Sequence, residues 1–252
     1  MKKNNIYEKA KEILERKNNI MVLSGAGLST DAGIPDFRSE DGLYSKKFKD
    51  YNPEDVLSID FLESQPDLFY EYIRENMCYF GIKPTKVYKY ITKLQNDGKV
   101  RSVVTQNIDK LHDAAGTSNV FEVHGNLVNF YCTNCGEKYS SEEMLKDKHS
   151  IYCDKCNHLI RPDVVLYGEA LKDFNDMLKE VDQADALLVL GSSLKVYPVA
   201  LIPNMFLDSG KEVIIINNQE TSYKGRKNVC EINEGIDDAF MELFPGYKDF
   251  KA

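Results

Sequence analysis

Short runs of aliphatic and β-branched residues recur along the 252-residue chain, and most contain almost no polar residue. Parallel strands that helices cover on both sides have this pattern, because both faces of the strand meet apolar side chains. We expect six such strands, at residues 20–24, 101–105, 119–123, 163–167, 186–190 and 212–216.

Between several of these runs, apolar residues recur at the spacing of one helical face. Residues 84–98 and 171–183 show this pattern, and so do residues 1–19. Alternating strands and helices predict an α/β fold built on a Rossmann-like, doubly wound parallel sheet.

Residues 39–83 and 128–160 do not follow this alternation. The first stretch is long, polar and aromatic with helical pieces, and the second holds four cysteines and little apolar periodicity. We expect both to be insertions that form a smaller module beside the sheet. Residues 1–252 would then be a single domain, whose Rossmann-like part spans about residues 1–38, 84–127 and 161–252.

The net charge of −8 narrows the range of partners. An acidic chain has no general attraction to nucleic-acid phosphates or to an anionic membrane surface. No apolar run approaches the roughly 20 residues that span a bilayer, and the N-terminus lacks the apolar core of an export signal. We therefore expect a cytoplasmic protein without nucleic-acid or membrane partners.

Four cysteines form two Cys-x2-Cys pairs that 17 residues separate, at Cys132, Cys135, Cys153 and Cys156. This spacing is typical of a four-thiolate zinc site, and four protein ligands make such a site structural because no coordination position stays open. His158 is an alternative ligand that the four cysteines make unnecessary. We therefore expect a zinc ribbon next to the helical insertion, and ordinary buried thiols at Cys78 and Cys230.

Glycines and small polar residues follow the predicted strands. Gly25 and Gly27 come after residues 20–24, where they would let the backbone approach a pyrophosphate. Thr30 stands where a dinucleotide fingerprint needs its third glycine, which argues against an oxidoreductase. After the next strand, Gln106, Asn107 and Asp109 suit a ribose, although Asp109 alone is equally well explained as a helix cap.

Further polar residues follow the later strands. His124 and Gly125 come after residues 119–123. Gly191 is followed by the hydroxyl residues 192–193, and amide residues occupy 217–218. Ligands of open α/β sheets bind at the carboxyl ends of the strands. These residues are therefore candidates for one common site, although a single histidine is more often structural than catalytic.

The combined motifs resemble the sirtuins, which are NAD-dependent protein lysine deacylases. The matching stretches are "SGAGLSTDAGIPDFR" (24–38), "TQNID" (105–109), "HGN" (124–126), both Cys-x2-Cys pairs, "RPDVVLYGE" (161–169), "GSSL" (191–194), "VYP" (196–198) and "IN" (216–217). They occur in the order and spacing of that family. The resemblance implies that NAD and an acyl-lysine peptide enter a cleft between the sheet and the zinc-bearing module from opposite sides.

The resemblance also assigns the site residues. It implies that His124 is the general base and Asn107 a second catalytic residue. Phe37 would shield the reactive sugar carbon, and Arg38 would contact a phosphate. The full cofactor-binding set would be Gly25, Ala26, Gly27, Ser29, Thr30, Asp36, Phe37, Arg38, Gln106, Asn107, Ile108, Asp109, His124, Gly191, Ser192, Ser193, Asn217 and Asn218. The peptide would lie along Val165, Tyr167, Gly168, Glu169, Val196 and Tyr197.

The implied reaction consumes NAD. The acyl oxygen of the substrate lysine attacks the sugar carbon as nicotinamide leaves, His124 removes a proton from the ribose hydroxyls, and water completes the reaction. The products are free lysine, nicotinamide and O-acyl-ADP-ribose. A contact from about residues 230–236 is also implied, without a single residue assigned.

Three positions depart from the commonest family wording. Tyr167 replaces a phenylalanine, "GSSL" replaces Gly-Thr-Ser, and Tyr88 stands where many members have histidine, away from the chemistry. Members that remove succinyl or malonyl groups carry a tyrosine and, three positions later, an arginine. Here that register pairs Tyr70 with Ile73, so we expect acetyl or other uncharged acyl groups to be preferred.

Two other functions compete with this interpretation. A non-enzymatic zinc-ribbon module that binds nucleic acid or protein would leave the polar strand ends without a role. ADP-ribosyl transfer to protein uses the same bond cleavage, and the sequence leaves it open as a side activity.

Overall fold

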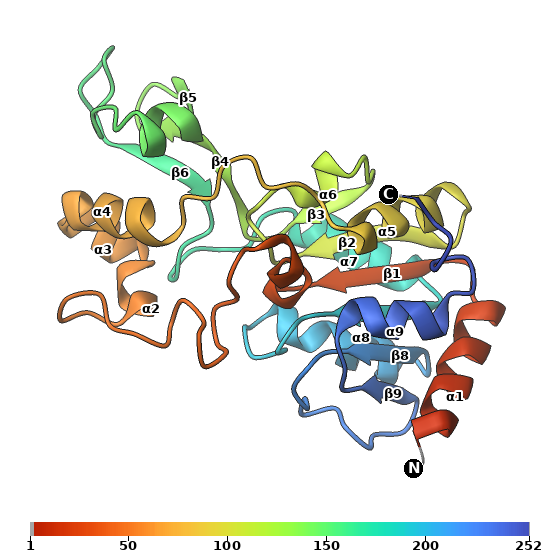
Figure 1. Ribbon diagram of the computed structural model, residues 1–252. Coiled ribbons are helices and arrows are strands. Elements are labelled where there is room, and N and C mark those ends of the chain that lie inside the picture. The colour runs from red at the N-terminus through yellow and green to blue at the C-terminus, as the bar shows by residue number, and fades with distance from the viewer. Residues whose placement is uncertain (1–2, 252) are drawn as a thin grey trace.

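A computed structural model describes residues 3–251, and a six-stranded parallel sheet forms its centre (Figure 1). In spatial order the strands are β3 (Val120–Glu122), β2 (Val100–Thr105), β1 (Ile20–Ser24), β7 (Ala186–Leu190), β8 (Glu212–Ile216) and β9 (Val229–Ile232). β1 lies between β2 and β7. After β1 the chain continues to β2 on one side of it, whereas after β7 it continues to β8 on the other side, so the connections diverge between β1 and β7. That point is where open α/β sheets bind their ligands.

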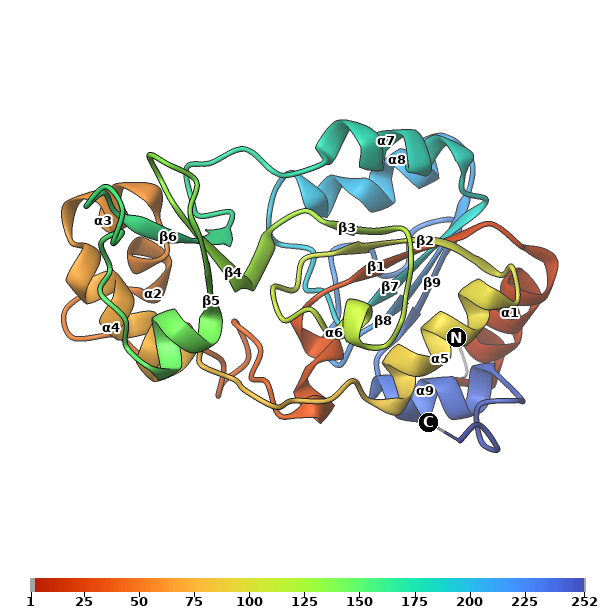
Figure 2. The ribbon, with the colours of Figure 1, turned by 90° about the horizontal axis from the view of Figure 1, so that it is seen from above.

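Helices cover both faces of this sheet (Figure 2). The helices α1 (Lys3–Arg16), α5 (Lys86–Asn96) and α9 (Ile236–Leu243) lie on one face, and α7 (Phe174–Gln183) and α8 (Ile202–Asp208) lie on the other. Successive residues of a strand point to opposite faces. Val22 accordingly packs in the core with α1, α5 and α9, whereas Leu23 packs with α7 and α8.

The short helix α6 (Leu111–Ala114) follows the loop after β2. Within residues 3–251, no helix has the length and apolar character needed to cross a bilayer. The predicted α/β fold with a doubly wound parallel sheet and a smaller module is confirmed.

The smaller module lies at one end of the parallel sheet (Figure 1). It contains the antiparallel strands β5 (Lys138–Ser140), β4 (Gly125–Cys132) and β6 (Ile160–Val164), in that spatial order. The helices α2 (Pro53–Val56), α3 (Ile59–Ser64) and α4 (Pro66–Asn76) pack against them, together with the single π-helical turn η3 (Glu142–Lys146). Phe69, Tyr70 and Phe130 are fully buried in the core that these elements share.

The prediction that residues 163–167 form a parallel strand is wrong. The strand there is β6, Ile160–Val164, and it pairs antiparallel with β4 in the small sheet. A short β-branched run also suits a half-buried antiparallel strand, so local sequence does not select its partner. β4 begins at Gly125, before the expected module boundary at residue 128. The division of the chain into two parts therefore stays a prediction.

Candidate active site and metal centre

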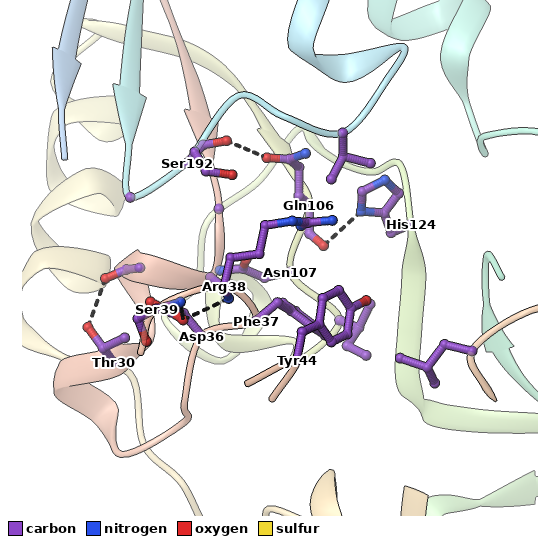
Figure 3. A pocket seen from close by; sticks show the side chains of 18 of the residues that line it. Thr30, Asp36, Phe37, Arg38, Ser39, Tyr44, Gln106, Asn107, His124 and Ser192 are labelled. Carbon is purple, nitrogen blue, oxygen red and sulfur yellow. Dashed lines mark hydrogen bonds between the residues drawn. The ribbon is translucent and has the colours of Figure 1, made fainter. Parts of the chain in front are cut away.

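A cavity of about 380 Å³ lies at the carboxyl edge of the parallel sheet, where the small module meets it (Figure 3). It collects residues from the loops that follow β1, β2, β7 and β8. Of the predicted cofactor and peptide residues, the cavity is lined by Gly25, Ala26, Gly27, Thr30, Asp36, Phe37, Arg38, Gln106, Asn107, Ile108, His124, Val165, Tyr167, Gly168, Glu169, Gly191, Ser192, Ser193, Val196, Tyr197, Asn217 and Asn218. Ser29 and Asp109 are not in its wall.

The glycines after β1 allow two loops to pack backbone against backbone. The amides of Gly25 and Gly27 donate to the carbonyls of Leu190 and Gly191, both at 2.9 Å. A Cβ on Gly25 would lie 2.7 Å from the Gly191 oxygen, and one on Gly27 would lie 2.9 Å from it. Contacts this short exclude any side chain. The glycines thus join the loops of β1 and β7 at the mouth of the cavity.

His124 is held in the tautomer that a general base requires. Its Nδ1 lies 3.0 Å from the backbone oxygen of Gln106. A carbonyl only accepts hydrogen bonds, so the proton sits on Nδ1, and Nε2 keeps its lone pair. The Gln106 side chain is fixed in turn, because Ser192 Oγ donates to its Oε1 at 2.6 Å (Figure 3).

Burial keeps this imidazole neutral. Desolvation lowers the pKa of His124 below its ordinary value, and the hydrogen bond to Gln106 opposes that effect only partly. The backbone around the ring is equally constrained, since the His124 carbonyl accepts from the Val165 amide at 2.8 Å. The next residue, Gly125, has a φ of 67°.

A buried hydrogen-bond network lies behind Asn107. Ser29 Oγ lies 2.6 Å from Asp109 Oδ2, 2.7 Å from the Tyr88 hydroxyl and 3.1 Å from Asn107 Nδ2. Asp109 Oδ1 accepts from the amide of Leu111, the first residue of α6, at 2.9 Å, although the N-cap residue itself is Lys110. Desolvation by burial raises the pKa of the Asp109 carboxyl. The expectation that Tyr88 lies away from the site is wrong, because α5 carries its hydroxyl into this network.

The loop at residues 36–39 is shaped by its own side chains. Asp36 Oδ1 accepts from the backbone amides of Arg38 and Ser39 at 3.0 and 2.8 Å. Phe37 packs edge-on against Tyr44, with ring centroids 5.2 Å apart. These contacts place Phe37 in the cavity (Figure 3).

Arg38 has protein partners in this structure. Its guanidinium forms a 3.0 Å ion pair with Glu54 and lies 3.3 Å from the Tyr167 hydroxyl. The predicted phosphate contact therefore requires Arg38 to leave Glu54.

Backbone hydrogen bonds to the helical insertion hold residues 165–169, the segment predicted to bind peptide. The Tyr167 amide donates to Leu57 at 3.0 Å, and the Ile59 amide donates to the Tyr167 carbonyl at 3.1 Å. Glu169, predicted as a peptide contact, forms a bidentate ion pair with Arg161, with both distances 2.7 Å. Its Oε2 also accepts from the Leu166 amide. The Glu169 carboxylate thus holds the segment at residues 165–169 in place through contacts inside the protein.

The four predicted zinc ligands come together in the small module. Their Sγ atoms all lie within 4.8 Å of one another, with Cys132–Cys156 at 3.4 Å and Cys135–Cys153 at 3.6 Å. Zinc–sulfur bonds of about 2.3 Å in a tetrahedron require sulfurs about 3.8 Å apart, so the arrangement fits zinc. His158 is not part of the cluster, and its Nδ1 donates to the Cys156 carbonyl.

The two thiols outside the cluster differ in burial. Cys230 is buried, as predicted, whereas Cys78 is only half-buried.

The residues used to predict acyl preference lie outside the cavity wall. The Tyr70 hydroxyl donates to the Ile160 carbonyl at 2.8 Å. Arg74 donates to the backbone carbonyls of Met144 and His149, at 2.8 to 3.1 Å. Hydrogen bonds thus hold the Arg74 guanidinium on the carbonyls of η3 and the loop after it.

Several lining residues were not identified from the sequence. They are Asp31, Ser39, Tyr44, Leu57, Met77, Val164, Leu166, Leu171, Gln219, Gly235 and Ile236. Gly235 and Ile236 line the cavity within the segment at residues 230–236, and the cofactor contact expected there stays a prediction. Tyr44, Leu57 and Met77 belong to the insertion at residues 39–83, whose irregular sequence gave no signal of which side chains reach the cavity.

Known proteins are similar to this chain in sequence. The model of the Sir2 family matches residues 25–198. A protein from Staphylococcus epidermidis named NAD-dependent protein deacetylase is 44% identical over 226 residues, which cover 88% of this chain and 90% of that protein. A protein of the same name from Clostridium perfringens is 38% identical over 231 residues, covering 90% and 94% of the two chains.

Solved structures are similar over almost the whole chain. A Sir2 variant with a deacetylated p53 peptide and 3′-O-acetyl-ADP-ribose superposes with a TM-score of 0.86 at 34% identity, covering 95% of this chain and 98% of the other. A Sir2 complex with a p53 peptide and NAD gives a TM-score of 0.82 at 35% identity, with the same coverage. The family model, the sequence relatives and the solved structures agree, and the chain belongs to the Sir2 family.

Proposed function

We propose that the protein removes acetyl groups from protein lysine side chains and consumes NAD in doing so, releasing nicotinamide and O-acetyl-ADP-ribose. The observation that carries this proposal is His124. Its Nδ1 proton is held by the Gln106 carbonyl, and its free Nε2 belongs to a neutral imidazole in the wall of the cavity. The names of the relatives and the ligands of the similar solved structures support the same activity.

NAD would bind along the carboxyl edge of the parallel sheet. It supplies a sugar carbon from which nicotinamide can leave. The loops after β1, β7 and β8 bring backbone groups and small polar side chains to that edge, among them Ser192 and Asn217. The loop after β2 adds Gln106 and Asn107, which suit the nicotinamide end and its ribose.

His124 would accept a proton at Nε2 from a ribose hydroxyl. A general base must be unprotonated at the working pH, and its basicity is best used when its pKa lies close to that pH. Because burial lowers the pKa of His124, the ring is unprotonated at neutral pH. Its hydrogen bond to Gln106 also stabilises the positive charge that the ring gains on accepting the proton.

Phe37 would keep water from the reacting sugar. Its ring lines the cavity and packs on Tyr44, which belongs to the insertion. An apolar ring at this place lowers the chance that water takes the acyl oxygen's position. Movement of the loop at residues 36–39 would free Arg38 from Glu54 for a phosphate.

The substrate peptide would lie between residues 165–169 and residues 196–197. Tyr197 is 70% exposed, and Tyr167 is 38% exposed. Both aromatic surfaces are thus available to a partner beside the cavity. An added peptide strand would pair with backbone groups of these two segments other than those of Tyr167, which bond to Leu57 and Ile59.

Acetyl groups would be preferred over succinyl groups. A dicarboxylic acyl group needs a cation at the end of its pocket, and Arg74 is instead bound to carbonyls outside the cavity wall. Arg38 is paired with Glu54.

The zinc site would have a structural role. Four thiolates leave no position for a water or substrate, so the metal would hold β4, β5 and β6 together. Reduced thiolates suit a cytoplasmic location, which is part of this proposal.

The test is a mass-spectrometric assay with NAD and matched acetyl-lysine and succinyl-lysine peptides. We expect the acetyl peptide to lose its acyl group faster. His124→Ala should abolish the loss while zinc content and circular dichroism stay unchanged. Faster removal of succinyl would contradict the acyl preference, and full activity of His124→Ala would contradict the site.

A further inference from the structure

Tyr88 is a fully buried tyrosine whose hydroxyl reaches the back of the candidate active site. Its hydroxyl lies 2.7 Å from Ser29 Oγ and 3.1 Å from Asn107 Nδ2. Its ring meets His112 edge-on, with centroids 4.7 Å apart. The reaction outlined above gives this residue no role, yet it contacts Asn107 directly.

The proton positions in this network follow from the acceptors. An ionised Asp109 can only accept, so Ser29 must donate to it across 2.6 Å. The Ser29 oxygen has then used its only proton, and the Tyr88 hydroxyl must donate to Ser29. The chain of donors therefore runs from Tyr88 to Ser29 to Asp109.

This direction determines how the Asn107 amide lies. Ser29 and Tyr88 have both given away their protons, so only their lone pairs face Asn107. The amide must turn its NH2 group toward them, at 3.1 Å from each oxygen. The opposite orientation would set the Asn107 oxygen against lone pairs. Among residues 3–251 no hydrogen bond involves Asn107 Oδ1, and Asn107 lines the cavity.

We propose that Tyr88 is a positioning residue, whose hydroxyl fixes the Asn107 amide so that Oδ1 is presented to NAD as a hydrogen-bond acceptor. The identity of the ligand rests on the proposed function. A hydroxyl of the nicotinamide ribose or the NH2 of the carboxamide would donate to this oxygen. Without the Tyr88 hydroxyl, one of the two acceptors of the Asn107 amide is lost, and the amide is free to rotate.

The first test measures NAD affinity of Tyr88→Phe by calorimetry on the full-length, zinc-loaded protein. We expect the Kd for NAD to rise about threefold to tenfold, which corresponds to one neutral hydrogen bond. The Kd for acetyl-lysine peptide should change less than twofold. Tyr247→Phe is the matched control, since Tyr247 is also fully buried and its hydroxyl bonds one residue, Asp237.

A double-mutant cycle shows whether Tyr88 acts through Asn107. In the Asn107→Ala background, Tyr88→Phe should weaken NAD binding less than twofold further. An equal loss in both backgrounds would overturn the proposal, and so would a wild-type NAD affinity in Tyr88→Phe.

A measurement on the wild-type protein decides the question if Tyr88→Phe does not fold. The side-chain amide protons of Asn107 are identified by NMR through their disappearance in Asn107→Asp. Both protons should exchange with solvent at least about tenfold more slowly than those of the exposed Asn175. Equal exchange rates would overturn the proposal. This readout needs no turnover, so it is separate from a failure of the deacetylase assay.

Discussion

His124 gains its chemical character from two neighbours and from burial. The Gln106 carbonyl fixes the Nδ1 proton, and the Ser192 hydroxyl steadies the Gln106 side chain. Desolvation keeps the ring neutral. None of these effects can be recognised from a lone histidine in a sequence, because the residues involved follow three different strands.

The pH dependence of the reaction tests this environment. The neutral form of His124 is the active base, so activity is present above its pKa and is lost as the pH falls through it. Because burial lowers that pKa, the acidic limb of kcat/KM should have its midpoint below the ordinary histidine value of 6.5. The measurement is kcat/KM for peptide at saturating NAD over a range of pH. A midpoint near 7.5 would contradict the assigned environment.

Gly125 is the residue on which the position of His124 depends most. A Cβ there would lie 1.9 Å from the Asp163 carbonyl oxygen, and the φ of 67° is unfavourable for any other residue. Gly125→Ala should therefore destabilise the protein by about 2 kcal/mol or more and reduce activity at least about tenfold. Urea unfolding and the peptide assay measure the two effects.

Gly98→Ala is the control for Gly125→Ala. Gly98 has a φ of 76°, but its Cβ would have no atom within 4 Å. Gly98→Ala should therefore lower the free energy of unfolding by about 1 kcal/mol, which is the cost of its backbone conformation alone. Its activity should be normal at a temperature where the variant is folded. Equal effects of the two variants on kcat would argue against the close contact with Asp163.

At the scale of elements, the segment at residues 164–169 is supported by the Arg161–Glu169 pair. Arg161 has a side chain only 10% exposed, so it depends on its carboxylate partner. Glu169→Gln should destabilise the protein by about 2 kcal/mol and raise the KM for peptide more than the KM for NAD. Steady-state kinetics with each substrate varied in turn measure the split. A selective rise in the KM for NAD would contradict this role.

Removal of zinc tests the structural role of the four-cysteine site in the small module. Metal binding and folding are coupled here, because Cys132 and Cys153 are buried in the core of the small module and the ion would hold the four thiolates together there. A strong chelator should unfold β4–β6, remove activity and leave much of the helical circular dichroism, since α1, α5 and α9 pack on the parallel sheet. Added zinc should restore activity. Full activity in metal-free protein would contradict the structural role.

The elements differ in how well sequence predicts them. The runs at 20–24, 186–190 and 212–216 coincide with β1, β7 and β8, because strands buried on both faces leave a continuous apolar signal. No apolar run indicates β9, because this strand is short and carries the buried Glu231, whose carboxylate accepts from the Thr221 amide and hydroxyl. β6 was assigned to the wrong sheet because pairing partners lie far apart in sequence.

On the scale of the whole molecule, the motifs name residues that the fold gathers around one cavity, and their roles with NAD and peptide stay predictions. Nearly every predicted cofactor residue lines the cavity, because most of them follow strands that end at one edge of the parallel sheet. The predicted peptide residues 165–169 line it from the small module, where they follow β6. The role of Tyr88 could not be predicted, since it depends on which face α5 turns to the loops after β1 and β2.

The central claim is that one cavity couples deacetylation to cleavage of NAD. The most direct measurement is a mass-spectrometric count of three products from NAD and an acetyl-lysine peptide: deacetylated peptide, nicotinamide and O-acetyl-ADP-ribose. We expect equal amounts of all three and none of them with His124→Ala. Deacetylated peptide with free acetate and intact NAD would contradict it.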